Sequence, residues 1–132
     1  MLYHHFGDKN KPPLVLLHGG GISCWMWEPQ IEKLKEDFHI IAPIIDGHDI
    51  DEGLFSTISD AADRLIAYIN DVLDGHIFAL CGFSLGAQIA LEVLSKRPSI
   101  ANFAIIESAL TEPMGWLSDL ALPMVGLSYG LV

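Results

Sequence analysis

Basic side chains are scarce in this sequence of 132 residues. Seven lysines and arginines stand against seventeen aspartates and glutamates, which gives a formal net charge of −10. A charge of this size repels nucleic acid and anionic membranes. No cluster of lysine or arginine reverses the charge locally. We therefore expect neither nucleic acid nor a membrane as a partner.

Cysteine is nearly absent as well. Cys24 and Cys81 are too few for a disulfide framework, and neither has the neighbours that a metal site needs. We therefore expect two free thiols, a reducing compartment and no metal. The first residues lack a basic start followed by an apolar run, so we expect no signal peptide and a cytoplasmic location.

Short apolar runs recur along the chain with helical segments between them. Each run is apolar on both faces of an extended chain, which is typical of strands buried in a parallel sheet. The runs are Leu14–Leu17, Phe38–Ala42 (ended by Pro43), Ile77–Cys81 and Phe103–Ile106, and Leu2–Phe6 is a candidate fifth strand.

The segments between the runs have apolar residues every three to four positions. One stripe runs from Trp27 to Phe38, and a second from Ala62 to Leu73 follows a capping box at Thr57–Asp60. The segment Leu85–Lys96 is apolar almost all round, which predicts a deeply buried helix. Alternating strands and helices predict an α/β fold with a doubly wound parallel sheet covered on both faces.

The stretch CGFSLGAQ places Ser84 between Gly82 and Gly86, directly after a predicted strand and before a predicted helix. A strand that turns straight into a helix bends sharply, and its neighbours need room that only glycine leaves. The hydroxyl is then exposed at the carboxyl edge of the sheet. The amide of Leu85 lies at a helix N-terminus, where negative charge is favoured.

A second glycine cluster, His18-Gly19-Gly20-Gly21, directly follows the first buried run. By itself it is equally typical of a plain strand-to-helix turn. However, both clusters lie at the carboxyl ends of predicted parallel strands, where open α/β sheets bind ligands. This shared position favours one common site.

Taken in order, the motifs resemble those of the α/β-hydrolase family. The similarity covers roughly residues 2–112 and rests on LVLLHGGG followed by two tryptophans, on Asp46-Gly47-His48, and on CGFSLGAQIAL. The resemblance implies that Ser84 is the nucleophile, that Gly20 or Gly21 and Leu85 supply oxyanion amides, and that no cofactor or metal is needed. It also implies that His18 and His48 organise loops, and that Phe83 and Leu85 flank a pocket for a small apolar substrate.

The pattern departs from this family at the catalytic base. Family members carry serine, then the acid, then histidine along the chain, yet all six histidines here precede Ser84. Glu107, at the end of the last apolar run, is a candidate acid, and a strand-end carboxylate facing water is the simpler alternative. We expect residues 1–112 to form a partial core, cut short before the cap and the last two strands. Residues 113–132 would begin a lid.

Three interpretations of the chain therefore stay open. The first is a serine hydrolase that cleaves an ester or related acyl bond through an acyl-enzyme. The second is a non-catalytic relative that holds a small ligand in the same pocket. The third is an incomplete chain whose open sheet edge pairs with another copy.

Overall fold

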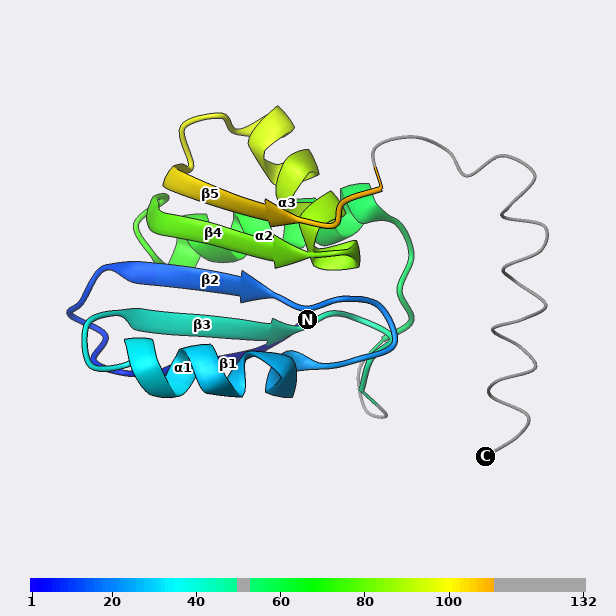
Figure 1. Ribbon diagram of the computed structural model, residues 1–132. Helices are drawn as coiled ribbons and strands as arrows, with labels where there is room; N and C mark the ends of the chain where they lie inside the picture. Colours follow the sequence, from blue (N-terminus) through cyan, green and yellow to red (C-terminus); the bar gives the residue numbers. More distant parts are fainter. Residues whose placement is uncertain (50–52, 111–132) are drawn as a thin grey trace, which may run out of the picture.

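The computed structural model, which describes residues 1–49 and 53–110, contains a five-stranded sheet flanked by helices (Figure 1). The predicted lid segment, 113–132, lies outside the described residues. In chain order the elements are β1 (Leu2–Phe6), β2 (Pro13–Leu17), the short 3-10 helix η1 (Cys24–Trp27), α1 (Glu28–Leu34), β3 (His39–Ile44), α2 (Ile58–Val72), β4 (Ile77–Phe83), α3 (Leu85–Lys96) and β5 (Ala101–Glu107).

The strand order is β1-β3-β2-β4-β5. Strands β3, β2, β4 and β5 are parallel, with Leu14 opposite both Ile40 and Ala79, whereas β1 runs antiparallel to β3 at the edge. The predicted α/β fold and its mostly parallel, doubly wound sheet are confirmed, and Leu2–Phe6 is indeed a strand. The chain steps outward from β2 to β3 and then returns to β4 on the other side of β2.

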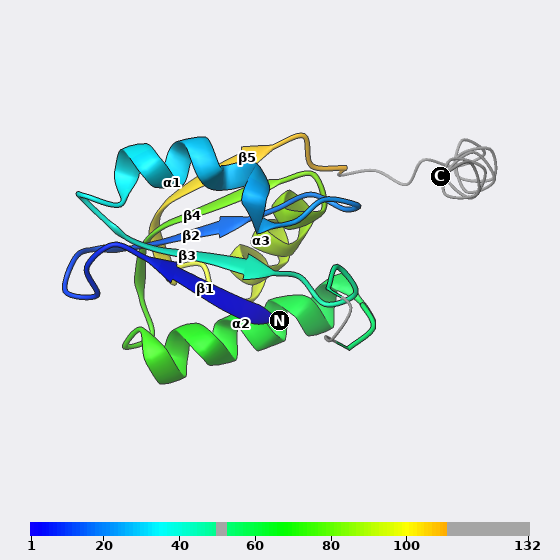
Figure 2. The same cartoon turned by 90° about the horizontal axis from the view of Figure 1, so that it is seen from below.

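Helices cover both faces of this sheet. Figure 2 shows α1 on one face and α2 and α3 on the other. Against α2 and α3, strand residues such as Val15, Ile41 and Leu80 form a fully buried core. Against α1, a smaller core includes Leu16 and Ile40. Buried strand residues thus alternate between two apolar layers, as strand geometry requires.

The second parallel strand continues through Pro43, where the sequence predicted that it would end. Proline has no amide hydrogen to donate to a ladder, so a strand interior normally rejects it. Here β3 is paired with β2 only at His39–Ile41, and Pro43 lies opposite Tyr3 of the edge strand β1. The pairing of β3 with β2 has already ended before Pro43, so the proline removes no hydrogen bond between these two strands.

The last apolar run differs from its prediction. Phe103–Ile106 was expected to be buried on both faces, but Phe103 and Ile105 are 60% and 61% exposed. Within the described residues, strand β5 is paired only with β4, and α1 covers the sheet nearer β2 and β3. The strand is present where it was predicted, but its outer edge and one face lack cover from the described part of the chain.

Helix α2 begins at the predicted cap. The Asp60 amide donates to the Thr57 hydroxyl oxygen at 3.0 Å, which satisfies one of the free donors of the first turn.

Across residues 1–49 and 53–110, no helix combines the length and the apolar character needed to cross a membrane.

A chain of hydrogen bonds links the edge strand β1 to β3 and α2. The Tyr68 hydroxyl lies 2.9 Å from Nε2 of His5, and Nδ1 of His5 lies 2.9 Å from Nε2 of the buried His39. Burial lowers the pKa of both imidazoles, and the charge of Lys9 lowers it further. A hydrogen bond between these two ring nitrogens requires that one of them lacks a proton, so protonation of both rings would remove it.

This arrangement predicts a loss of stability in mild acid. Because the folded pKa values are lowered, the unfolded chain binds more protons below about pH 6.5, so the free energy of unfolding falls as pH drops. Each histidine contributes at most about 1.4 kcal/mol per pH unit. Urea denaturation between neutral and mildly acidic pH measures the slope. We expect a smaller slope in His39→Gln, and an equal slope in the two proteins would contradict the prediction.

Candidate active site

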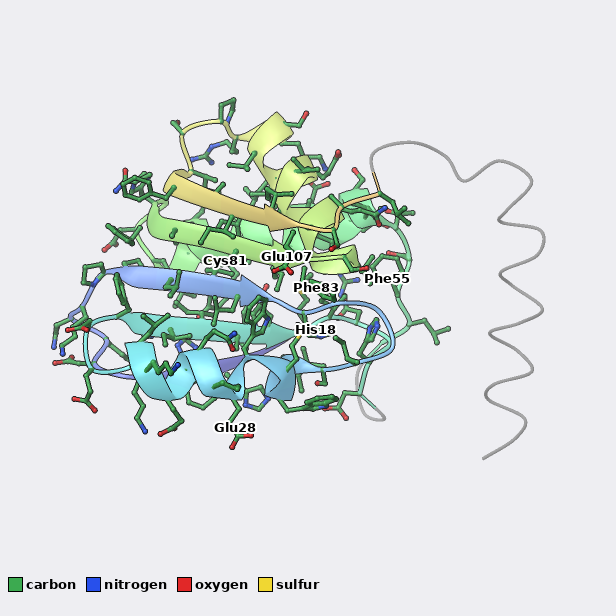
Figure 3. The ribbon with its side chains drawn as sticks, in the orientation of Figure 1. His18, Glu28, Phe55, Cys81, Phe83 and Glu107 are labelled. Carbon is green, nitrogen blue, oxygen red and sulfur yellow. The ribbon has the colours of Figure 1, made fainter. Side chains whose placement is uncertain are left out.

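The predicted site residues lie where the chain reverses its winding direction, at the carboxyl ends of β2 and β4. Open α/β sheets bind ligands in the crevice outside these strand ends. The glycine loop His18–Gly21 leaves β2 there, and the turn at Ser84 leaves β4. Figure 3 shows His18, Phe83 and Glu107 at this same end of the sheet.

Ser84 forms the whole connection between β4, which ends at Phe83, and α3, which begins at Leu85. Its backbone has φ 50° and ψ −110°, a conformation that non-glycine residues rarely adopt. The Ser84 amide donates to the Glu107 carbonyl at 2.9 Å, and this bond anchors the strained turn to β5. The side chain forms no capping hydrogen bond to α3. The sharp turn predicted at Ser84 is therefore confirmed.

Gly82 and Gly86 permit a close backbone approach. A Cβ atom on Gly86 would lie 2.4 Å from the Leu17 carbonyl oxygen and 2.6 Å from that of His18. A Cβ on Gly82 would lie 2.4 Å from the carbonyl oxygen of Gly86. Both contacts are with backbone atoms, which cannot swing aside. The two glycines thus hold the first turn of α3 against the end of β2.

The glycine loop reaches the start of α3. A Cβ placed on Gly20 would lie 3.8 Å from the Cβ of Leu85, and one placed on Gly19 would lie 2.9 Å from the ring of Phe83. Gly21 has φ 73°, in the region that favours glycine. The structure therefore brings together Gly20 and Leu85, two residues whose amides the family resemblance implies would bind an oxyanion.

Leu85 is the first residue of α3, so its amide has no acceptor within the helix. The aligned peptide dipoles of the helix also place partial positive charge at this end. A negative oxygen near Ser84 would meet both effects. Both features favour negative charge at the start of α3, and the oxyanion role of the Leu85 amide stays a prediction.

His18 holds the glycine loop and uses both of its ring nitrogens to do so. The Ile45 amide donates to Nε2 at 3.0 Å, which leaves Nδ1 to donate to the Gly19 carbonyl at 2.8 Å. Burial lowers the pKa of His18, and neighbouring His48 lowers it further. The ring is fully buried and neutral, with no nitrogen left to accept a proton from Ser84. It is a positioning residue for the loop.

His48 packs edge-on against His18, with ring centroids 5.0 Å apart. The buried Asp46 holds its loop. The Asp46 carboxylate forms one ion pair with Arg64, at 3.1 Å, and a second with the Met1 amino group. Sequence reasoning included Asp46 in a motif but did not predict these partners. Arg64 lies on α2 and Met1 precedes β1, so no local spacing relates either of them to Asp46.

Glu107, the candidate acid, ends β5 opposite Phe83 in the parallel register. Its backbone carbonyl holds Ser84, while its side chain is exposed and lines a groove on the α1 side of the sheet. The observed contact of Glu107 with the serine turn is thus made by the backbone. Its role as an acid stays a prediction.

Five of the six histidines in the described residues divide between the two ends of the sheet. His18 and His48 lie at the site, whereas His39 begins β3 and His76 precedes β4 at the opposite ends of the strands. His5 is hydrogen-bonded to His39 and shares that far end. His4 lies on the edge strand β1 opposite Ala42, with β3 and β2 between it and β4. Of the residues 1–49 and 53–110, His18 and His48 are therefore the histidines near the serine turn. Nowhere in these described residues do three or more potential metal-binding side chains form a group.

A cavity of about 620 Å³ opens beside the glycine loop, between η1 and the loop after β3. Apolar and polar groups both line it: Gly21, Ile22, Ser23, Trp25, Ile44, Gly47, His48 and Asp49. Phe83 and Leu85, which the resemblance implies flank the pocket, do not line this cavity. A ligand held there would contact the loop that carries Gly20 and Gly21.

In this open α/β sheet, a strained serine turn and a glycine loop lie together at the switch point, as is typical of the α/β-hydrolase fold. A family model of the alpha/beta hydrolase fold matches residues 12–127. The chain belongs to this family, as its ordered motifs suggested.

Several known proteins resemble the chain. It is 32% identical over 101 residues to (E)-2-((N-methylformamido)methylene)succinate hydrolase of Acinetobacter baylyi, covering 75% of this chain and 38% of that protein. It is 30% identical over 89 residues to the pimeloyl-[acyl-carrier protein] methyl ester esterase of Nitrosomonas europaea, covering 67% of this chain and 34% of that protein. The chain thus spans little more than a third of the length of these relatives.

A solved structure agrees on the fold. The chain superposes on a thermophilic esterase from Thermogutta terrifontis with a TM-score of 0.74 at 24% identity, covering 84% of this chain and 41% of that one. At this identity the similarity concerns the fold alone. The relatives are named as hydrolases and esterases, which supports a hydrolase family for this chain.

Substitution of Gly86 by alanine tests the close approach. The new methyl group would collide with the carbonyls of Leu17 and His18, so we expect Gly86→Ala to lower the free energy of unfolding by more than about 2 kcal/mol. Gly53→Ala is the control, because nothing lies within 4 Å of a Cβ there. Urea denaturation followed by circular dichroism measures both. Equal stability of the two variants would contradict the geometry.

Proposed function

We propose that this chain carries the nucleophile and the oxyanion-binding part of a serine hydrolase. The enzyme cleaves a carboxylic ester or related acyl bond through an acyl-enzyme on Ser84. The observation that carries the proposal is the strained turn at Ser84, φ 50°, beside the free first-turn amide of Leu85 and next to Gly20. Backbone strain of this kind, here at a half-buried serine, is typical of functional sites.

The proposed reaction has two steps. The Ser84 oxygen attacks the acyl carbon, its proton passes to a base, and the amides of Gly20 or Gly21 and of Leu85 stabilise the oxyanion. The base then gives this proton to the alcohol oxygen as the carbon–oxygen bond to the alcohol breaks, which leaves the acyl group on Ser84. Water releases the acid in the second step. This acyl transfer requires no cofactor.

The substrate we propose is a small molecule with an apolar acyl group. Ile22, Trp25 and Ile44 supply apolar surface in the cavity beside the glycine loop, and Ser23 and Asp49 add polar groups at its rim. We place the activity in the cytoplasm, where the free thiols of Cys24 and Cys81 stay reduced.

A second candidate function is ligand binding without catalysis. One observation favours it: both ring nitrogens of His18 are occupied within the loop, so this buried histidine cannot act as the general base. The two proposals differ in whether acyl transfer depends on Ser84. Hydrolysis measured with an added base therefore distinguishes them.

We expect the chain alone to hydrolyse activated aryl esters slowly, because general-base help is typically worth about 10² to 10⁴ in rate. Imidazole added to the solution should supply a base and accelerate hydrolysis well beyond its own reaction with the ester. This acceleration should be lost in Ser84→Ala. The measurement is the release of nitrophenol from a short-chain ester, with the acyl group located on Ser84 by mass spectrometry.

Ser108→Ala is the matched control, since Ser108 is also a strand-end serine with positive φ, 55°. It should keep the imidazole effect. An acceleration that is equal in the chain and in Ser84→Ala would overturn the hydrolase proposal and leave ligand binding. Brisk Ser84-dependent turnover without imidazole would instead show that the chain already contains its base.

A further inference from the structure

A second pocket lies at the opposite end of the sheet from the serine turn. It has a volume of about 350 Å³, in the range of small-molecule sites, and lies between the β1–β2 loop, the start of β3, the end of α2 and the turn before β4. Figure 1 shows the β1–β2 loop at the end of the sheet away from the point where the chain leaves β5. The pocket is lined by His5, Lys9, Lys11, Pro13, His39, Val72, Leu73, Asp74 and His76.

Basic side chains gather in this pocket, although the whole chain carries a net charge of −10. Two of its seven lysines and arginines and three of its six histidines line the pocket, together with one carboxylate, that of Asp74. The local sequence gives no sign of this cluster, because the histidines come from β1, from the start of β3 and from the turn before β4. The fold thus creates a basic pocket on an acidic protein.

The two lysines supply charge that is available to a ligand. Within residues 1–49 and 53–110, Lys9 forms no ion pair, whereas Lys35 and Lys96 each have a carboxylate partner. Lys11 donates to the backbone carbonyl of Glu36, and an ammonium group has two further hydrogens to donate. Neither lysine is therefore neutralised by an ion pair within the described chain.

His39 adds a directed polar atom to the pocket wall. The residue is 4% exposed, and its Nε2 lies 2.9 Å from Nδ1 of His5. Its own Nδ1 has no hydrogen-bond partner within residues 1–49 and 53–110, whereas His5 and His76 use both ring nitrogens in contacts with the protein. Polar atoms of buried side chains normally have a partner, so this nitrogen is a free contact for a ligand.

We propose that this pocket binds a small organic carboxylate, held by Lys9, Lys11 and Nδ1 of His39. The ammonium groups, and the ring nitrogen when it carries a proton, donate to the carboxylate oxygens, and such charge-assisted hydrogen bonds are strong. The pocket and Ser84 lie at opposite ends of the sheet, so this site does not depend on the proposed hydrolase activity.

The lining also indicates which oxyanion fits. Pro13, Val72 and Leu73 give the wall an apolar part, which suits a short hydrocarbon stem. With the imidazoles neutral, two lysines and Asp74 leave one positive charge, which a single carboxylate balances. A phosphate dianion would bring a second negative charge close to Asp74. A monocarboxylate is therefore the better match.

Carboxylates of increasing length test the site by NMR at constant ionic strength. Hexanoate should shift the ring resonances of His39, identified by their loss in His39→Gln, and should bind at least tenfold more tightly than acetate, because its stem reaches the apolar wall. Hexanol has the same stem without the charge and should bind at least tenfold more weakly than hexanoate. Equal binding of hexanol and hexanoate, or tighter binding of inorganic phosphate than of hexanoate, would overturn the proposal.

Lys9→Gln tests the charge, with Lys33→Gln as its matched control. Both lysines are exposed and form no ion pair within the described residues, but Lys33 lies on α1 and does not line the pocket. Lys9→Gln should weaken hexanoate binding at least fivefold, whereas Lys33→Gln should change it less than twofold. Circular dichroism checks that both variants are folded. Equal hexanoate affinity in the two variants would overturn the proposal.

The affinity for hexanoate should rise as pH falls from 7.5 to 6. Burial lowers the pKa of His5 and His39, and Lys9 lowers both further, so the two rings are neutral in the empty pocket near pH 7. A bound carboxylate favours the protonated ring, so binding takes up a proton and strengthens in mild acid. The titratable groups around these rings are His4, Asp8, Lys9, Lys11, Tyr68, Asp74 and His76. An affinity that falls with pH, or stays constant, would overturn the proposal.

Discussion

The contact between the first turn of α3 and the end of β2 is the constraint on which the site depends. The backbone of Gly86 lies so close to the carbonyls of Leu17 and His18 that a methyl group would fill the same space. This contact fixes where α3 starts, and therefore where Ser84 turns. It also brings the first amide of the helix beside the loop that leaves β2. Geometry that supports charge stabilisation thus follows from a packing constraint between two backbones.

Much of this arrangement was predictable, because local sequence carries it. Glycines at 82 and 86 predicted the turn at Ser84, and apolar runs predicted the four parallel strands. The family resemblance placed His18 in its loop, and the structure adds the hydrogen bonds of its ring to Ile45 and Gly19. In each case the residues that decide the structure are neighbours along the chain or belong to an ordered motif.

What the sequence did not reveal depends on contacts between distant segments. The partners of Asp46 come from α2 and from the start of the chain, and the chain of Tyr68, His5 and His39 joins three elements. The burial of β5 was mispredicted for a related reason. Apolar composition indicates that a strand belongs in a sheet, but it does not say whether the chain in hand provides the cover. Pro43 likewise stayed within β3 because the adjacent ladder had ended, which the sequence alone does not show.

The site is linked to the edge of the described sheet by one strand. Glu107 holds the strained turn through its carbonyl, so the position of Ser84 depends on β5 remaining in the sheet. Within residues 1–49 and 53–110, β5 is an edge strand that pairs on one side with β4, and its Phe103 and Ile105 are exposed. Residues at a sheet edge open more readily than those in a paired interior. The conformation of the serine turn and the order of β5 are therefore coupled through a single backbone hydrogen bond of 2.9 Å, from the Ser84 amide to the Glu107 carbonyl.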